Sequence, residues 1–174
     1  MIDACRRAGM PFVAEEHGVS RDERQSMPPK NDDLFLPGLD EALSAYLGVA
    51  VKRYPNGLTV AAPSPSGFEM TAMVSDAGYA LYFDNWVEEF ESSEIALQIF
   101  TEALKGKARL KVDLLAGRRW RWTLERLNDA GEWFAESTTD HVIWRFWGRQ
   151  STIYLRNAFP LRPGSADGGI RRAN

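Results

Sequence analysis

Apolar residues recur at helical spacing in two segments of the chain. The first segment, with Leu39 and Leu43 at its start, predicts a helix over residues 39–53. Gly48 leaves another interpretation open, in which a shorter helix ends there and a hairpin turns at Asn56-Gly57. The second segment predicts a helix between Ser92, which can cap its start, and Gly106, which can end it.

Short apolar or alternating segments, separated by Gly, Pro, Asn and Asp, predict strands on both sides of the second helix. Long runs of strands with few helices between them favour antiparallel pairing. We therefore expect the α+β class, with two helices packed on one face of a curved, mostly antiparallel meander sheet. The predicted strands are 58–62, 68–74, 79–84, 86–90, 109–115, 118–127, 132–136, 141–147 and 152–156.

The two ends of the chain differ from its middle in composition. Residues 1–37 contain polar, charged and Pro-rich stretches, and residues 160–174 are rich in Gly, Pro and Arg. Such segments bury too little apolar area to offset the entropy lost on ordering. We expect one domain over residues 38–159 between two disordered tails, with Met27 as an alternative start of the chain.

Side chains alternate along a strand, so four of the predicted strands assign their residues to two faces. One face is apolar, and we expect its tryptophans, Trp120, Trp122 and Trp144, to pack in the core. The opposite face is basic and aromatic, with Asp113 and Glu125 as its only acidic residues. The candidate binding residues on this face are Arg109, Lys111, Arg119, Arg121, His141, Arg145, Trp147, Tyr154 and Arg156.

This basic and aromatic face is compatible with three roles. Arg and Thr are common cross-strand neighbours on a solvated sheet face that binds nothing. Arg and Trp are also enriched at protein interfaces, whereas cations with aromatic rings suit phosphates and bases. Residues 1–104 hold 7 Lys and Arg against 17 Asp and Glu, and residues 105–174 hold 14 against 7. The two halves can neutralise each other, and the net charge of −3 weakens the case for nucleic acid.

The sequence contains no recognisable catalytic motif. Asp140-His141 is the only adjacent acid–imidazole pair in the segment expected to be ordered, but neighbours on a strand point to opposite faces. Asp140 is therefore not expected to orient His141 as a general base. The carboxylates of residues 88–94 fit a solvated acidic patch. With Cys5 as the only cysteine and two histidines, we expect no disulfide, no metal site and no cofactor.

No apolar run approaches the ~18 residues of a membrane helix, and no signal-peptide pattern is present. We therefore expect a cytoplasmic protein without a membrane partner. Our leading hypothesis is a non-enzymatic protein-interaction or self-association module that uses the basic and aromatic face. The alternatives are a nucleic-acid or anionic-ligand binder through the same face, and an enzyme with a dispersed site. The expected anchors of the leading hypothesis are Arg121, Arg145, Trp147 and Tyr154.

Overall fold

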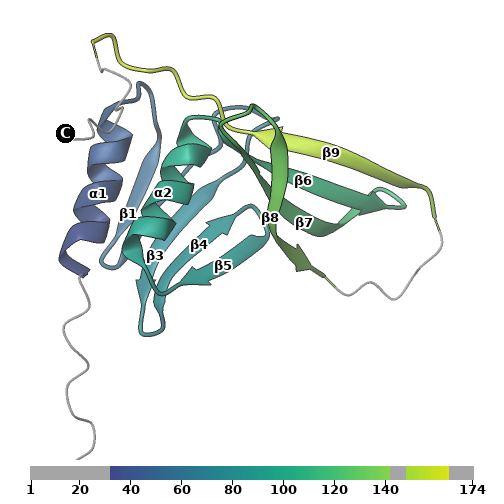
Figure 1. The fold of residues 1–174 in the computed structure, drawn as a ribbon, viewed down its shortest axis with the longest axis horizontal. Helices are drawn as coiled ribbons and strands as arrows, with labels where there is room; N and C mark the ends of the chain where they lie inside the picture. The colour runs from purple at the N-terminus through teal and green to yellow at the C-terminus, as the bar shows by residue number, and fades with distance from the viewer. Residues whose placement is uncertain (1–31, 142–147, 165–174) are drawn as a thin grey trace, which may run out of the picture. The chain divides into compact units, whose positions relative to one another are not determined.

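The computed structural model describes residues 32–141 and 148–164 (Figure 1). Two helices and nine strands lie within these ranges. In chain order they are α1 (Asp32–Ser44), β1 (Val51–Tyr54), β2 (Gly57–Val60), β3 (Met70–Ser75), β4 (Gly78–Phe83), β5 (Trp86–Phe90), α2 (Ser93–Leu104), β6 (Ala108–Leu115), β7 (Arg118–Leu127), β8 (Trp133–Asp140) and β9 (Gln150–Arg156).

The strands form two antiparallel sheets. β1 to β5 follow one another in a five-stranded meander, whereas the four-stranded sheet has the order β8-β7-β6-β9 (Figure 1). The α+β class with two helices is confirmed, but the strands are divided between two sheets instead of forming one. An alternating pattern assigns side chains to faces; it does not determine which strands pair across a long connection.

α1 begins and ends earlier than the helix predicted over residues 39–53. Phe35, Leu39 and Leu43 lie one turn apart and are 0%, 0% and 7% exposed. Burial of this apolar stripe therefore determines which residues form the helix. Pro37, which falls in the predicted N-terminal tail, lies inside the helix. A Cβ on Gly38 would lie 2.6 Å from a methyl carbon of Leu97, so this glycine permits the close approach of α2.

The chain after α1 forms a hairpin, as the alternative interpretation of the sequence proposed. β1 pairs with β2, and Tyr54 lies opposite Gly57 across a turn at Pro55-Asn56. Gly48 has a φ of +67°, in the left-handed region that favours glycine, and it lies between the helix and β1. The prediction of one long helix is therefore wrong, because residues 51–54 gain backbone partners in the sheet.

α2 has the ends that were predicted for it. The Oγ of Ser92 accepts a hydrogen bond from the Ile95 N–H at 3.4 Å. Gly106 has a φ of +69° and follows the last turn. α2 packs against α1 and against β4, β5 and β6, so it contacts both sheets.

The hydrophobic core is shared by the helices and both sheets. Phe83 lies between Phe68 and Trp86, with ring centroids 5.3 and 5.1 Å apart. Trp86 is completely buried, and its Nε1 donates to Ser137 Oγ of β8 at 3.0 Å. Burial of each such side chain contributes roughly 1.5–3 kcal/mol, so this cluster is a main source of stability.

Two polar side chains join the sheets. Asp84, between β4 and β5, accepts hydrogen bonds on one carboxylate oxygen from Arg119 Nη1 at 2.8 Å and from Trp122 Nε1 at 3.0 Å. Asn157, after β9, is completely buried. Its amide accepts from the Phe68 N–H at 2.8 Å and donates to the Phe68 carbonyl at 3.0 Å, as a neighbouring strand would.

The predicted tails are only partly covered by the described residues. Residues 32–37 belong to α1, and residues 1–31 and 165–174 lie outside the description. Leu161 forms a β-bridge with Tyr46, and the Arg162 N–H donates to the Ala45 carbonyl at 2.8 Å. The start of the segment expected to be a C-terminal tail therefore contacts the chain just after α1.

Candidate functional site

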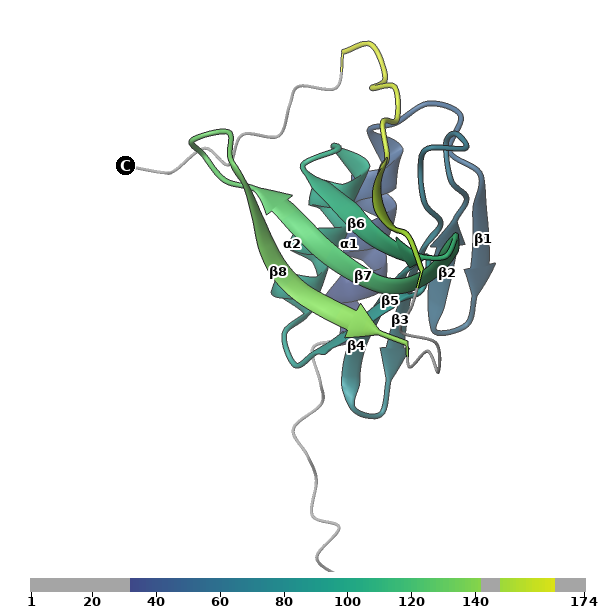
Figure 2. The same ribbon diagram turned by 90° about the vertical axis from the view of Figure 1, so that its right-hand side faces the viewer.

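The four-stranded sheet has one face turned away from the helices, which we call the outer face. Figure 2 looks onto this face, with α1 and α2 behind the sheet. The strand register places its side chains in rows across the sheet. These rows are Arg156–Arg109–Glu125, Tyr154–Lys111–Thr123–Thr138 and Thr152–Asp113–Arg121–Asp140. The register therefore brings together five of the predicted site residues: Arg109, Lys111, Arg121, Tyr154 and Arg156.

Arg109 is the centre of a stack of aromatic rings and guanidinium groups on the outer face. Its guanidinium carbon lies 4.2 Å from the ring centre of Trp133 and 4.4 Å from that of Tyr154. Its Nε also donates to Glu125 at 2.7 Å. Arg156 extends the stack, because its guanidinium lies 5.4 Å from the Trp133 ring and its Nε donates to the Gly106 carbonyl at 2.7 Å. Ion pair and stacking together hold Arg109 in one orientation.

A second aromatic–guanidinium pair lies at the other end of the outer face. Arg121 stacks on Trp120 at 4.3 Å and makes two hydrogen bonds to Asp140, at 2.7 and 3.1 Å. These hydrogen bonds lower the pKa of Asp140 below its ordinary value of 3.8, so its carboxylate stays charged. The side chains of Trp120 and Arg121 line a small hollow of about 260 Å³, together with Asp113 and Thr152.

The outer face is less basic than the sequence suggested. Arg109 pairs with Glu125, and Arg121 pairs with Asp140. Lys111 is half-buried between Tyr154 and Thr123 and makes no ion pair with a described residue. Two of the four cations placed on this face are therefore neutralised there, because the cross-strand register sets carboxylates beside them.

Two of the sequence predictions, for Arg119 and Trp120, are wrong because β7 contains a β-bulge. Asp113 pairs with Arg121 and Leu114 pairs with Arg119, so Trp120 is an extra residue without a partner on β6. Beyond the bulge the alternation shifts by one position. Arg119, predicted on the outer face, instead reaches Asp84 beside the buried Trp122. Trp120, predicted in the core, is half-buried and lies on Arg121, whereas Trp122 is in the core as predicted.

His141 also differs from its predicted position. Its ring makes an edge contact with Trp122, with centroids 4.9 Å apart, whereas its neighbour Asp140 binds Arg121 on the outer face. The acid and the imidazole are thus directed to different partners, which agrees with the expectation that Asp140 does not orient His141. The predicted site residues Arg145 and Trp147, and the predicted core residue Trp144, lie outside the described residues.

Sequence reasoning missed two members of the outer face, Trp133 and Trp120. Trp133 opens β8, and the predicted strand of residues 132–136 was not assigned to faces. Counting back from Asp140 would still have failed, because a second register shift lies between Leu124 and Glu125. Alternation within a strand could therefore not have found either tryptophan.

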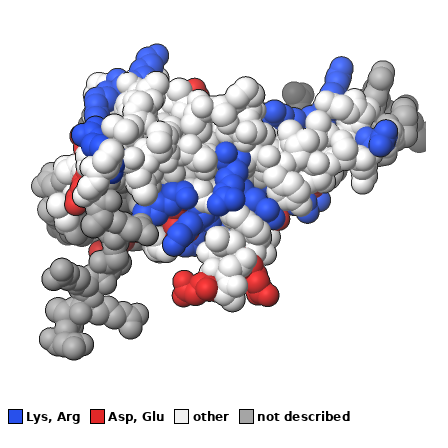
Figure 3. Space-filling model, turned by 90° about the horizontal axis from the view of Figure 1, so that it is seen from above, with Lys and Arg blue, Asp and Glu red and all other residues white. Residues whose placement is uncertain are grey.

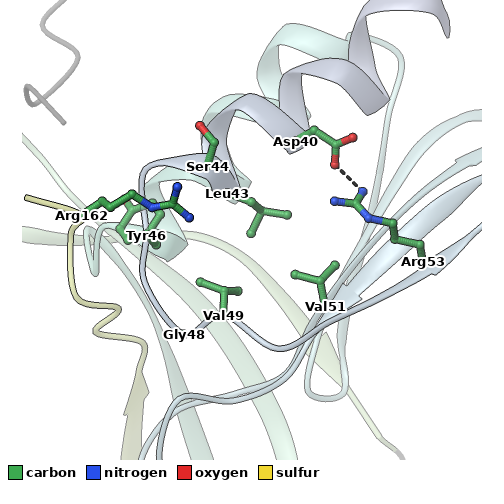
Figure 4. A pocket seen from close by; sticks show the side chains of 9 residues that line it. All are labelled: Asp40, Leu43, Ser44, Tyr46, Gly48, Val49, Val51, Arg53 and Arg162. Carbon is green, nitrogen blue, oxygen red and sulfur yellow. Dashed lines mark hydrogen bonds and ion pairs between the residues drawn. The ribbon is translucent and has the colours of Figure 1, made fainter. Parts of the chain in front are cut away.

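The remaining surface offers two further features. Seen from above, Lys and Arg side chains gather over the region where α2 ends and β6 begins, a connection that contains the exposed Lys105 and Lys107 (Figure 3). A pocket of about 340 Å³ lies between the end of α1 and β1. In Figure 4, Arg53 and Arg162 approach it from opposite sides, and Arg53 pairs with Asp40.

Comparisons with known proteins give no further guidance to the site. No protein-family model matches this chain, and neither curated proteins nor solved structures give a match. Among residues 32–141 and 148–164, no helix has the length and apolar character needed to cross a membrane. In the same part of the chain, no group of three or more His, Cys, Asp or Glu side chains is placed to hold a metal ion.

Proposed function

We propose that this protein is a protein-interaction module that binds its partner through the outer face of the four-stranded sheet. The observation that carries the proposal is the stack around Arg109. The guanidinium lies between Trp133 and Tyr154, at 4.2 and 4.4 Å from their ring centres, and Tyr154 remains 51% exposed.

Residues of these types dominate the energetics of protein interfaces. Trp, Tyr and Arg are enriched among interface residues whose removal costs more than about 2 kcal/mol of binding energy. Here the ion pair from Arg109 to Glu125 at 2.7 Å fixes the stack before any partner arrives. A side chain that is already ordered loses little conformational entropy on binding, so a fixed aromatic surface favours association.

The internal ion pairs favour a protein partner over a nucleic acid. A phosphate backbone would compete with Glu125 for Arg109 and with Asp140 for Arg121. Nucleic-acid binding draws its affinity from cations that are available to phosphates. A protein surface can instead pack on the rings of Trp133 and Tyr154 and leave both ion pairs in place.

The enzyme hypothesis gains no support from the acid–imidazole pair. Asp140 is engaged by Arg121 through two hydrogen bonds, and His141 contacts Trp122. A general base needs its orienting carboxylate and its reactive nitrogen in one arrangement. These two side chains belong to different surroundings.

The proposal is tested with Tyr154→Ala and Trp133→Ala, and with Tyr82→Ala as a matched control. Tyr82 is 40% exposed but lies on β4 of the other sheet. Light scattering over a range of concentrations measures self-association, and capture from host extract with each variant as bait measures binding of other proteins. We expect the two outer-face variants to weaken the complex at least about tenfold, and the control to leave it unchanged.

Two results would contradict this function. One is a complex that all three variants form with the same affinity as the original chain, which would place the interface elsewhere. The other is an original chain that stays monomeric and captures from host extract no protein whose binding is weakened by Tyr154→Ala or Trp133→Ala.

A further inference from the structure

β9 is an edge strand with one free side. It pairs with β6 from Gln150 to Arg156 without a register shift, and it ends the order of the four-stranded sheet. Figure 1 shows it along the outer border of that sheet. The backbone groups on its other side are therefore available unless another segment covers them.

The direction of these backbone groups follows from one hydrogen bond. The Arg156 N–H donates to the Ser66 carbonyl at 2.9 Å, so it points away from β6. In an antiparallel ladder the residues of one strand bond alternately toward and away from a given partner. Thr152 and Tyr154 share the phase of Arg156, so their N–H and C=O groups point outward, whereas Ile153 and Leu155 bond to β6. Within the described part of the chain, nothing bonds to the outward backbone groups of Thr152 and Tyr154.

The other sheet edges carry features that hinder pairing, whereas within the described residues β9 is covered only at its end, where the Ser66 carbonyl bonds to the Arg156 N–H. β1 contains Lys52 and Arg53, and Pro55 follows it. On β5, the Thr139 hydroxyl occupies both backbone groups of Val87, at 3.2 and 3.3 Å. β8 contains a register shift where it pairs with β7. β9 contains neither Pro nor Lys, and its ladder is regular.

We propose that a second copy of this chain pairs with β9, antiparallel, about a two-fold axis at Ile153. Thr152 of one copy then lies opposite Tyr154 of the other, and these residues exchange backbone hydrogen bonds in both directions. This inference goes beyond the proposed function, because it uses the edge of the four-stranded sheet and not its outer face. The outer faces of the two copies become one continuous surface, with the Arg109 stack on each side of the axis.

The side chains of β9 are complementary to themselves in this register. Ile153, which is partly buried against the core, meets its own copy on the inner side. Thr152 and Tyr154 form a β-branched–aromatic pair on the outer face, a favourable cross-strand combination. Arg156, the one charged residue of β9, lies outside the segment that pairs with the second copy, because the Ser66 carbonyl already occupies its outward N–H. No like charges meet, so a second copy fits the edge without repulsion.

The test is sedimentation equilibrium of the original chain, Thr152→Pro and Thr152→Val. Proline removes the outward N–H of residue 152 and leaves the ladder to β6 intact, because that ladder uses the neighbouring residues. Both variants lose the hydrogen bond from the Thr152 hydroxyl to Asp113, so valine is the matched control. We expect the original chain and the valine variant to dimerise, and proline to weaken the dimer at least about tenfold.

Amide hydrogen exchange tests the same register without a substitution. The N–H groups of Thr152 and Tyr154 should become protected as concentration rises, whereas those of Ile153 and Leu155 should be protected at every concentration. Rapid exchange of Thr152 and Tyr154 in a sample that is dimeric would overturn the inference.

The outcomes separate this inference from the proposed function. A dimer that survives Thr152→Pro but is lost in Trp133→Ala rejects edge pairing and supports docking on the outer face. A chain that stays monomeric at all concentrations also rejects edge pairing, and the function then depends on capture of another protein by the outer face. A dimer lost in Thr152→Pro but retained in Trp133→Ala supports edge pairing and leaves the outer face without a role in it.

Discussion

β4 of the five-stranded sheet is buried at every position except Tyr82, whereas β9 of the four-stranded sheet is exposed at every position except Ile153 and Leu155. Both strands belong to one shared core, yet they place their side chains in different surroundings. α2 and the aromatic cluster of Phe83 cover the first strand. The second lies at an edge, beside side chains held by ion pairs and stacking. We therefore expect changes in the first sheet to act on folding and, under the proposed function, changes on the outer face of the second sheet to act on binding.

The sharpest test of this comparison replaces one tryptophan in each sheet. Trp86 is completely buried against Phe83, and Trp133 is half-buried on the outer face. We expect Trp86→Ala to lower the free energy of unfolding by about 3–5 kcal/mol, because it leaves a cavity. Trp133→Ala should cost no more than about 1 kcal/mol. Urea denaturation measures both, and equal losses would show that the outer face is a folding element.

Asp84 offers a test of how strongly the two sheets are joined. Its carboxylate accepts from Arg119 Nη1 and from the Nε1 of Trp122, which is 3% exposed. Asp84→Ala leaves that indole N–H without its acceptor and should cost about 1–3 kcal/mol in thermal or urea unfolding. Asp84 has a φ of +54°, which asparagine tolerates well, so Asp84→Asn should retain most of the stability. Unchanged stability in Asp84→Ala would mean that this carboxylate does not contribute to joining the sheets.

The ion pair between α2 and β7 predicts a dependence of stability on pH. Partial burial tends to raise the pKa of Glu102, but hydrogen bonds from Arg126 and Gln98 outweigh it and lower the pKa below 4.5. A lowered pKa adds stability that is complete above the unfolded value of 4.5 and is lost as pH falls through the folded value.

Glu102→Gln should therefore lower the free energy of unfolding by about 1–2 kcal/mol at pH 7. The difference from the original chain should shrink as the pH falls below 4.5. Urea denaturation from pH 7 to pH 3 measures it. A difference that is constant over this range would assign the effect of the substitution to packing and not to charge.

The sequence was most informative where a local pattern decides the structure. β7 and β5 have the bounds that were predicted, and Ser92 and Gly106 mark the ends of α2 as expected. These features depend on side-chain alternation, a capping hydroxyl and a glycine with positive φ, all of which are encoded within a few residues.

The failures share a different cause, which is contact between distant parts of the chain. Burial of Phe35 beside Tyr79, with ring centroids 4.7 Å apart, extends α1 into a segment that resembles a tail. The neutralisation of Arg109 depends on a register that sets Glu125 beside it, 16 positions away. The periodicity of the chain encodes neither of these contacts. The alternation of side chains was therefore enough to identify the candidate face, but the positive charge expected on it was too high.

The bulge in β7 has a consequence for how this chain tolerates change in length. Trp120 has no partner residue on β6, so β7 contains one more residue than β6 over the same length of the ladder. Deleting Trp120 would restore regular pairing and leave Arg119 opposite Leu114, but it would remove the ring that stacks on Arg121. A related or redesigned sequence therefore keeps the link to Asp84 and the stack on Arg121 only if it keeps Arg119 and the extra tryptophan at position 120.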